Sequence, residues 1–177
     1  MKTFNSFILL TLLIGVSSFA QTDQRYYSKT INDIQFVDYR VYKNTNIADS
    51  LLNQYPSRSS VNFPDSSEAS RDIKVVNTWR EFRDNFLASV NFDEFDFEKR
   101  KCSIFFTLHF DQEGQLKHVL FNWLNGLEFP EMTDHFATFT SEYDFSGFPQ
   151  GADWSQCGTI TLNRNDLKKA QTELASK

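Results

Sequence analysis

The chain has 177 residues, of which 18 are basic and 23 acidic, giving a net charge of −5. Because the charges are acidic overall and interspersed, nucleic acid and anionic membrane surfaces are excluded as expected partners. The length suits one ordinary domain, and nineteen phenylalanines against two methionines indicate a core or an interface built on aromatic rings.

Residues 1–20 are predicted to be a secretory signal peptide that is removed by cleavage. A lysine precedes an apolar run from Phe7 to about Val16, and Ser18 and Ala20 supply the small side chains of a signal peptidase site. The apolar run is shorter than the ~20 residues that a membrane span needs, and no cysteine follows it to carry a lipid. We therefore expect a periplasmic or secreted protein of residues 21–177, with net charge −6 and no membrane span after cleavage.

Residues 21–71 are predicted to form an N-terminal arm. Residues 34–42 (IQFVDYRVY) alternate as a strand does, and residues 44–54 have the spacing of a short helix. Residues 57–71 are rich in serine and are expected to be a surface loop. The strand places three side chains on one side, Val37, Tyr39 and Val41.

Residues 72–177 are predicted to form an α+β domain. After a brief extended piece at residues 72–76, Thr78 and Glu81 make a capping box, so a helix is expected over about residues 79–90. Residues 91–101 follow, with four carboxylates among phenylalanines. Calcium binding is the functional interpretation of these carboxylates, but the spacing of an EF-hand is missing, and a solvated face is favoured. The carboxylates are Asp93, Glu94, Asp96 and Glu98.

The clearest pattern is a β-hairpin over residues 103–123. Two runs of strand-forming residues flank a turn from Asp111 to Gly114, in which Gly114 takes the left-handed conformation. Asp111 then pairs with Gln115, and alternation divides the hairpin into two faces. One face is predicted to be core: Ile104, Phe106, Leu108, Phe110, Leu116, His118 and Leu120.

The opposite face of the hairpin is the predicted binding surface, since aromatic side chains carry most interface energy. The alternative is that residues 26–70 cover this face. The predicted binding residues are Phe105, His109, Val119, Phe121 and Trp123, beside Thr107 and Lys117.

The remaining elements complete a two-layer α+β prediction. A helix is expected at 130–142, where Pro130 suits the first turn and the apolar side chains make one stripe. Residues 145–154 are a loop, residues 157–164 a final strand, and the polar tail from residue 165 a frayed helical end. The sheet is expected to be antiparallel and built on the hairpin.

No catalytic, metal or cofactor site is predicted. The hairpin register places His109 and His118 on opposite faces, which removes that pair as metal ligands, and His135 is expected to be exposed. No nucleophile elbow, zinc-protease motif or phosphate-binding loop is present in the sequence.

Two cysteines, Cys102 and Cys157, follow the predicted signal peptide. In an exported chain an even pair favours a disulfide, and the alternative is a Cys/His nucleophile, although nothing nearby marks an activated thiol.

The order helix, strand, tight turn, strand, helix, strand, with WREFRDNFLASVNF and SIFFTLHFDQEGQLKHVLF, resembles the C-terminal domain of TonB-like proteins over residues 78–164. The resemblance implies a small α+β unit whose last strand, here Thr159–Asn163, lies at a sheet edge where an extended peptide can add. This chain has a cleavable signal and only four prolines, unlike the anchored energy transducers with their proline-rich spacer. In this layout the last strand runs antiparallel to the first strand of the hairpin, which places Cys102 and Cys157 toward opposite ends of the sheet. The layout and the disulfide are therefore incompatible unless the loop before Cys157 doubles back.

We therefore expect an exported, non-enzymatic binding or envelope-associated module. It would recognise a protein or peptide of the cell envelope through a sheet edge or the aromatic sheet face. The alternative is a small secreted hydrolase with its site under the loop at residues 145–154. Oligomeric state is not predicted.

Overall fold

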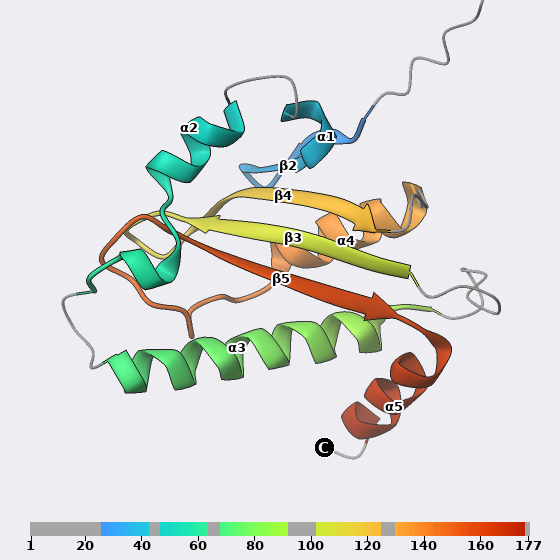
Figure 1. The fold of residues 1–177 in the computed structure, drawn as a ribbon. Helices are drawn as coiled ribbons and strands as arrows, with labels where there is room; N and C mark the ends of the chain where they lie inside the picture. The colour runs from blue at the N-terminus through green and yellow to red at the C-terminus, as the bar shows by residue number, and fades with distance from the viewer. Residues whose placement is uncertain (1–25, 43–46, 64–67, 92–101, 125–129, 176–177) are drawn as a thin grey trace, which may run out of the picture.

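The computed structural model describes residues 26–42, 47–63, 68–91, 102–124 and 130–175 (Figure 1). Two predictions lie outside these ranges: the signal peptide over residues 1–20 and the acidic stretch with its alternative of calcium binding. None of the described helices is long and apolar enough to cross a membrane.

Five strands form one mixed sheet in the order β1-β2-β4-β3-β5. β2 runs parallel to β4, and the other neighbouring pairs are antiparallel. The α+β class is confirmed, but the sheet is mixed rather than antiparallel because N-terminal residues add β1 and β2 beside the hairpin. The strands are β1 (Ser28–Ile31), β2 (Ile34–Asp38), β3 (Cys102–Phe110), β4 (Leu116–Leu124) and β5 (Trp154–Leu162).

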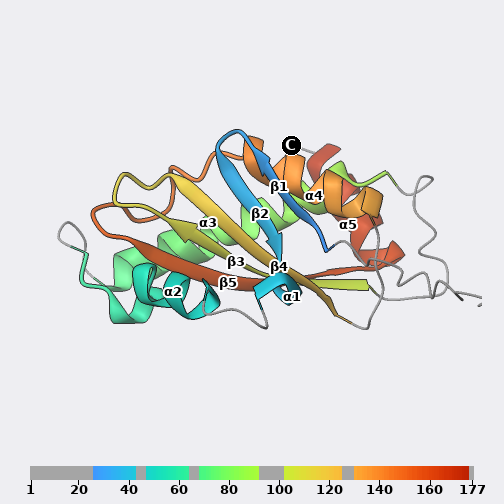
Figure 2. The same cartoon turned by 90° about the horizontal axis from the view of Figure 1, so that it is seen from above.

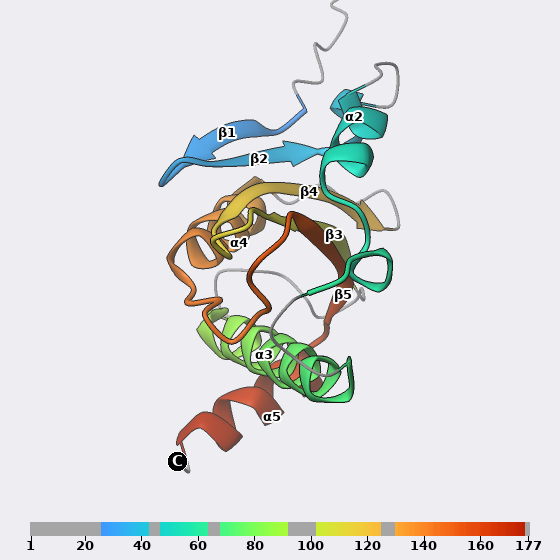
Figure 3. The same cartoon turned by 90° about the vertical axis from the view of Figure 1, so that its left-hand side faces the viewer.

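Helices lie on both faces of this sheet. On the inner face, one aromatic core joins α3 and α4 to the central strands, with Phe82, Phe86, Phe106 and Phe136 fully buried. On the outer face, α2 and a smaller apolar cluster cover part of β2 and β4. Figures 2 and 3 show α2 and α4 on opposite sides of the sheet. The helices are α1 (Tyr39–Tyr42), α2 (Ile47–Gln54), α3 (Glu68–Ser89), α4 (Pro130–Glu142) and α5 (Arg164–Ala175), with a short 3₁₀ turn, η1 (Arg58–Ser60).

The predicted hairpin turn is present. The Asp111 N–H donates to the carbonyl of Gln115 over 3.0 Å, and the Gly114 N–H donates to the carbonyl of Asp111 over 2.9 Å. Gly114 has a φ of +76°, the left-handed conformation that favours glycine. The Asp111 carboxylate also accepts the N–H of Gln115 at 2.8 Å.

The register beyond that turn differs from the prediction because of a β-bulge. Phe110 pairs with Leu116, but His109 pairs with His118, so Lys117 is an extra residue in β4. One inserted residue reverses the side to which all later side chains of the strand point. Leu116 lies in the core as predicted, but the two predicted faces are wrong for β4 beyond Lys117. Val119, Phe121 and Trp123 lie inward with Ile104, Phe106 and Leu108, whereas His118 and Leu120 lie outward.

Helix α3 begins at Glu68, about ten residues before the predicted start, so the expected extended piece at residues 72–76 is helical. The capping box at Thr78 and Glu81 lies inside the helix. Its buried positions, Arg71, Val75, Thr78, Phe82 and Phe86, recur every three or four residues, which is the spacing of one helix face. Packing of this stripe against the sheet therefore overrides the local start signal.

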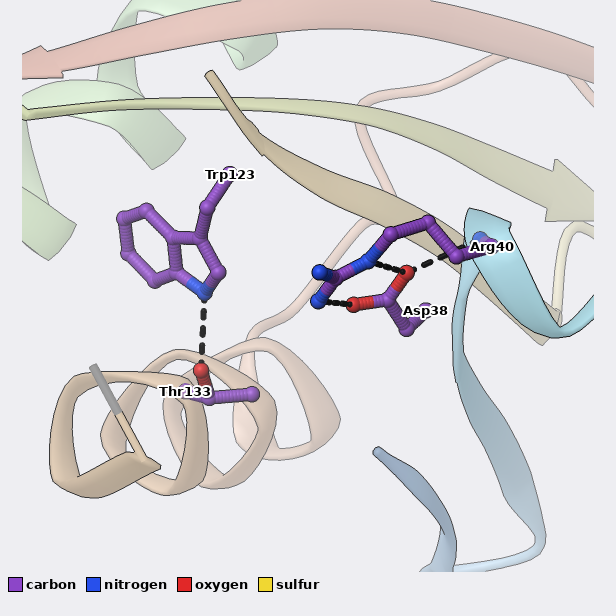
Figure 4. Close-up of polar contacts among 4 residues, drawn as sticks. All are labelled: Asp38, Arg40, Trp123 and Thr133. Carbon is purple, nitrogen blue, oxygen red and sulfur yellow. Dashed lines mark hydrogen bonds and ion pairs between the residues drawn. The ribbon is translucent and has the colours of Figure 1, made fainter. Parts of the chain in front are cut away.

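The strand predicted for residues 34–42 ends at Asp38, and α1 begins at the next residue, Tyr39. The Asp38 carboxylate accepts the backbone N–H of Arg40 at 2.8 Å, as a helix N-cap does, and its other oxygen lies 2.6 Å from the Arg40 guanidinium (Figure 4). Capping and pairing keep this buried carboxylate satisfied. β1 was not predicted, and residues 164–175 form the regular helix α5 where a frayed end was expected.

Candidate binding site at the open edge of the sheet

The five predicted binding residues do not form one surface. Phe105 and His109 lie on the outer face, where Phe105 is 39% exposed and His109 only 1%. The bulge at Lys117 turns Val119, Phe121 and Trp123 into the core, where all three are buried. Trp123 is fixed there, since its indole N–H donates to the Thr133 hydroxyl of α4 over 2.8 Å (Figure 4).

The structure brings His109 and His118 together, so their predicted separation is wrong. Their ring centroids lie 6.3 Å apart on the outer face. His109 Nδ1 donates to the carbonyl of His118 at 3.3 Å, and His118 Nδ1 donates to the Gln35 side chain at 3.1 Å. In the described part of the chain, no three His, Cys, Asp or Glu side chains are grouped to hold a metal ion.

The predicted disulfide is absent, and both thiols are free. Cys102 pairs with Leu162 and Cys157 pairs with Thr107, so the two cysteines lie five ladder positions apart on neighbouring strands. At the rise of an extended strand this is about 17 Å, far beyond the reach of a disulfide. The antiparallel pairing of β3 with β5 is therefore present, and it is incompatible with a disulfide between Cys102 and Cys157. Cys102 is buried, and burial raises its pKa to about 12.

Strand β5 is the edge at which a partner strand can add. It is the last strand of the sheet, and no described strand pairs with its outer side (Figure 1). The Ser155 N–H points outward, because it donates to the Pro56 carbonyl at 2.9 Å. The ladder to β3 is regular, so the N–H groups of Cys157, Thr159 and Thr161 point the same way.

The chain itself already uses the first part of this edge. Ser57 makes a parallel bridge with Ser155, directly after Tyr55 and Pro56. The Ser155 hydroxyl also donates to the Pro56 carbonyl at 3.4 Å. Beyond this bridge, none of the strands in the described ranges lies beside the outward backbone groups of β5.

A groove follows that open part of β5. It has a volume of about 370 Å³ and lies between β5, α3 and α5. Arg83 and Asp84 of α3 are paired on its wall, with a distance of 2.6 Å between guanidinium and carboxylate, and Lys169 of α5 adds a second cation. The residues that line it are Arg83, Asp84, Leu87, Thr159, Thr161, Lys169 and Ala170.

Sequence reasoning located this strand but missed its surroundings. The resemblance indicated Thr159–Asn163 as an edge strand, and the structure gives Trp154–Leu162. The contribution of α5 was missed, although Leu167, Ala170 and Leu174 have helical spacing in the sequence. The bridge from Ser57 had no signal, because it joins a loop to a strand almost 100 residues away.

The predicted loop before β5 is filled by its own aromatic side chains. Phe145, Phe148 and Trp154 are buried, and the rings of Trp154 and Phe110 stack with centroids 5.1 Å apart. A second hollow of about 370 Å³ lies beside this loop, lined mainly by the two hairpin turns and the end of α4. Its carboxylates include Asp33 and Asp144.

Comparison with protein-family models, with curated proteins and with solved structures gives no match for this chain.

Proposed function

We propose that this protein is an exported, non-enzymatic binding module that takes an extended segment of a cell-envelope protein as an additional strand on β5. The observation that carries the proposal is the outer edge of β5, where outward backbone groups at Thr159 and Thr161 line a groove. Strand addition satisfies such groups with main-chain hydrogen bonds, while the groove receives alternate side chains.

Two further features support this proposal. The bridge between Ser57 and Ser155 is a short example of the same pairing, made by the chain with itself. The element order α3-β3-β4-α4-β5 agrees with the resemblance to the C-terminal domain of TonB-like proteins, in which the last strand can accept a peptide. The predicted signal peptide is the basis for placing this activity in the periplasm or outside the cell.

The test is a proline at the open edge. Thr159→Pro removes an outward N–H without removing a hydrogen bond to β3, because the Thr159 N–H points away from β3. We expect peptides selected from a display library of linear sequences to lose about tenfold or more in affinity for Thr159→Pro. The matched control, Thr159→Ala, keeps the N–H and removes only side-chain atoms at the groove, so its loss of affinity should be much smaller than that of Thr159→Pro.

The binding mode has its own readout. A peptide that adds as a strand should slow hydrogen exchange at the amides of Thr159 and Thr161, which would then be hydrogen-bonded. Circular dichroism and thermal melting establish that the proline variant is folded. If folded Thr159→Pro binds the selected peptides with unchanged affinity, or if protection appears only away from β5, the strand-addition proposal is wrong.

A further inference from the structure

One segment of the chain contacts both the buried histidine pair and the edge of β5. We call residues 47–63 the strap; it comprises α2, the extended residues that follow, and η1, and it crosses the outer face of the sheet (Figure 3). Near its middle, the Tyr55 ring packs edge-on against His109 and His118, with centroid distances of 5.4 and 5.7 Å. The next two residues, Pro56 and Ser57, hold Ser155 of β5.

This covalent continuity couples the two contacts. No residue separates Tyr55 from Pro56, so Tyr55 cannot leave the histidines while Pro56 stays in place on Ser155 without local distortion. The strap is held elsewhere by Leu51, which packs on the outer face, and by Phe63, whose ring lies 5.8 Å from that of Trp154. In this position the strap covers the histidines and the start of β5 together.

The surroundings of His109 and His118 favour their neutral forms while Tyr55 packs on them. Burial lowers the pKa of His109 from its ordinary 6.5 to about 4, although its hydrogen bond to the His118 carbonyl opposes the change. Burial, and then the nearby Lys117 ammonium, lower the pKa of His118. The charged and titratable groups around the pair are Tyr55 of the strap, Lys117 and Asp111 at the hairpin turn, and Asp153 before β5.

We propose that the strap is an acid-sensitive cover of the β5 edge: protonation of His109 and His118 releases Tyr55 from the sheet, Pro56 and Ser57 leave Ser155 with it, and the edge open to a partner strand lengthens toward Trp154. This inference rests on the proposed function, because it concerns regulation of the same edge. The physical cause is that His109, 1% exposed, has no water to solvate a positive charge beneath Tyr55, and that a second imidazolium at His118 would repel it.

The direction with pH follows from the two states of His109. When the strap is open, His109 regains its ordinary affinity for protons, whereas the closed state resists protonation. Closure is therefore fully stabilised above about pH 6.5 and is weakened as pH falls toward about 4. At about pH 5 this linkage increases the open fraction about 20-fold relative to neutral pH.

Hydrogen exchange followed by NMR tests the cover without any partner. The amide of Ser155 is hydrogen-bonded to the Pro56 carbonyl, so its exchange reports closure of the strap on β5. After correction for the intrinsic exchange rate, we expect protection of the Ser155 amide to fall about 20-fold between about pH 7 and about pH 5. Amides in the ladder between β3 and β4 should keep their protection.

Variants identify the groups that respond. His109→Asn keeps a side-chain N–H near Nδ1 but cannot be protonated, so the fall in Ser155 protection should disappear. His118→Asn, at a half-buried position that tolerates change better, should reduce the fall and serves if His109→Asn does not fold. His135→Asn is the matched control: His135 lies on α4, bonded to the Ser89 hydroxyl, and should leave the pH response unchanged.

Two results would overturn the inference: equal Ser155 protection at both pH values, or an undiminished response in both His109→Asn and His118→Asn. The display-selected peptides then test regulation. These peptides should bind the unmodified protein several-fold more tightly at about pH 5 than at about pH 7, and their binding at about pH 5 should protect the Ser155 amide from exchange. Neither effect should be seen with His109→Asn. Unchanged peptide affinity despite opening would also refute it. If Thr159→Pro binds the peptides with unchanged affinity, the proposed function is wrong. The pH dependence of Ser155 protection, which is measured without a partner, would still test the strap.

Discussion

At the scale of single residues, Gly158 allows α3 to pack closely against β5. The ring of Trp79 lies directly on the Gly158 backbone, and a Cβ built at Gly158 would lie 1.8 Å from Trp79 Cζ2. Trp79 in turn packs on Phe106, with a centroid distance of 5.1 Å. A side chain at residue 158 therefore cannot be accommodated unless the indole moves out of the core.

We predict that Gly158→Ala destabilises the protein by about 1–3 kcal/mol through overpacking. Urea unfolding followed by tryptophan fluorescence measures this change in free energy. The control is Thr159→Ala at the next residue, whose side chain is exposed and whose loss should cost less than about 0.5 kcal/mol. Equal stability of the two variants would mean that Trp79 does not rest on Gly158.

Gly114 and Gly158 differ in how far their roles can be predicted from the sequence. The role of Gly114 was predictable because a turn is local: the hydrogen-bonding aspartate stands three residues before it. The role of Gly158 was not, because the ring that requires it comes from Trp79, remote in the sequence, and no local pattern records that approach.

At the scale of elements, the bulge at Lys117 decides which side chains of β4 enter the core. The alternative register without a bulge was plausible because both faces of the hairpin carry apolar residues. A signal was nevertheless present: Val119, Phe121 and Trp123 form a more apolar row than His118, Leu120 and Asn122. Pairing that row with the apolar row of β3 requires one extra residue in β4.

Deletion of Lys117 tests this directly. Without the extra residue, either the turn must distort or Phe121 and Trp123 must turn outward, so we predict that the deletion variant loses cooperative unfolding. The control Lys117→Ala keeps the chain length. It removes the partly exposed ion pair between Lys117 and Asp111, 2.9 Å long, and should cost less than about 1 kcal/mol. A deletion variant as stable as Lys117→Ala would refute the bulge.

The bounds of a helix could be predicted where they depend on local sequence, and could not where they depend on packing against distant residues. α4 was predicted with the observed bounds, because its proline start and its apolar stripe are both local. The start of α3 was misplaced because Thr78 and Glu81 have a capping pattern, whereas the helix is extended upstream by burial of Val75 against the core. β1 was missed because its residues are mostly exposed and carry little apolar alternation.

At the scale of the whole molecule, sheet topology was the least predictable property. The parallel pairing of β2 with β4 joins residues that are about 80 positions apart, and no feature of either strand specifies its neighbour. The antiparallel pairing of β3 with β5 agrees with the layout that the resemblance implies, and it sets the two cysteines apart. The candidate edge was thus foreseen in outline, while the strap and α5 that flank it were not.

That topology predicts the behaviour of the thiols. Under non-reducing conditions we expect two free thiols per chain, with one, Cys157, reacting with a disulfide reagent in the native state. Cys102 should react only when the protein is unfolded, since its thiol is buried and its pKa is raised. Titration of the thiols before and after addition of guanidinium counts the thiols that react in the native and in the unfolded protein. No reactive thiol in unfolded, unreduced protein would mean that the cysteines are bonded and the pairing of β3 with β5 is wrong.

The two edges of the sheet are unequal, and this limits how copies of the chain can associate. β1 is four residues long and carries Lys29, which is paired with Asp134, whereas β5 is nine residues long. A short edge that bears a lysine resists further pairing. Head-to-tail stacking of sheets, which requires both edges, is therefore disfavoured. Two copies that met through β5 would instead close on a two-fold axis, so self-association would end at a dimer and not continue into a fibre.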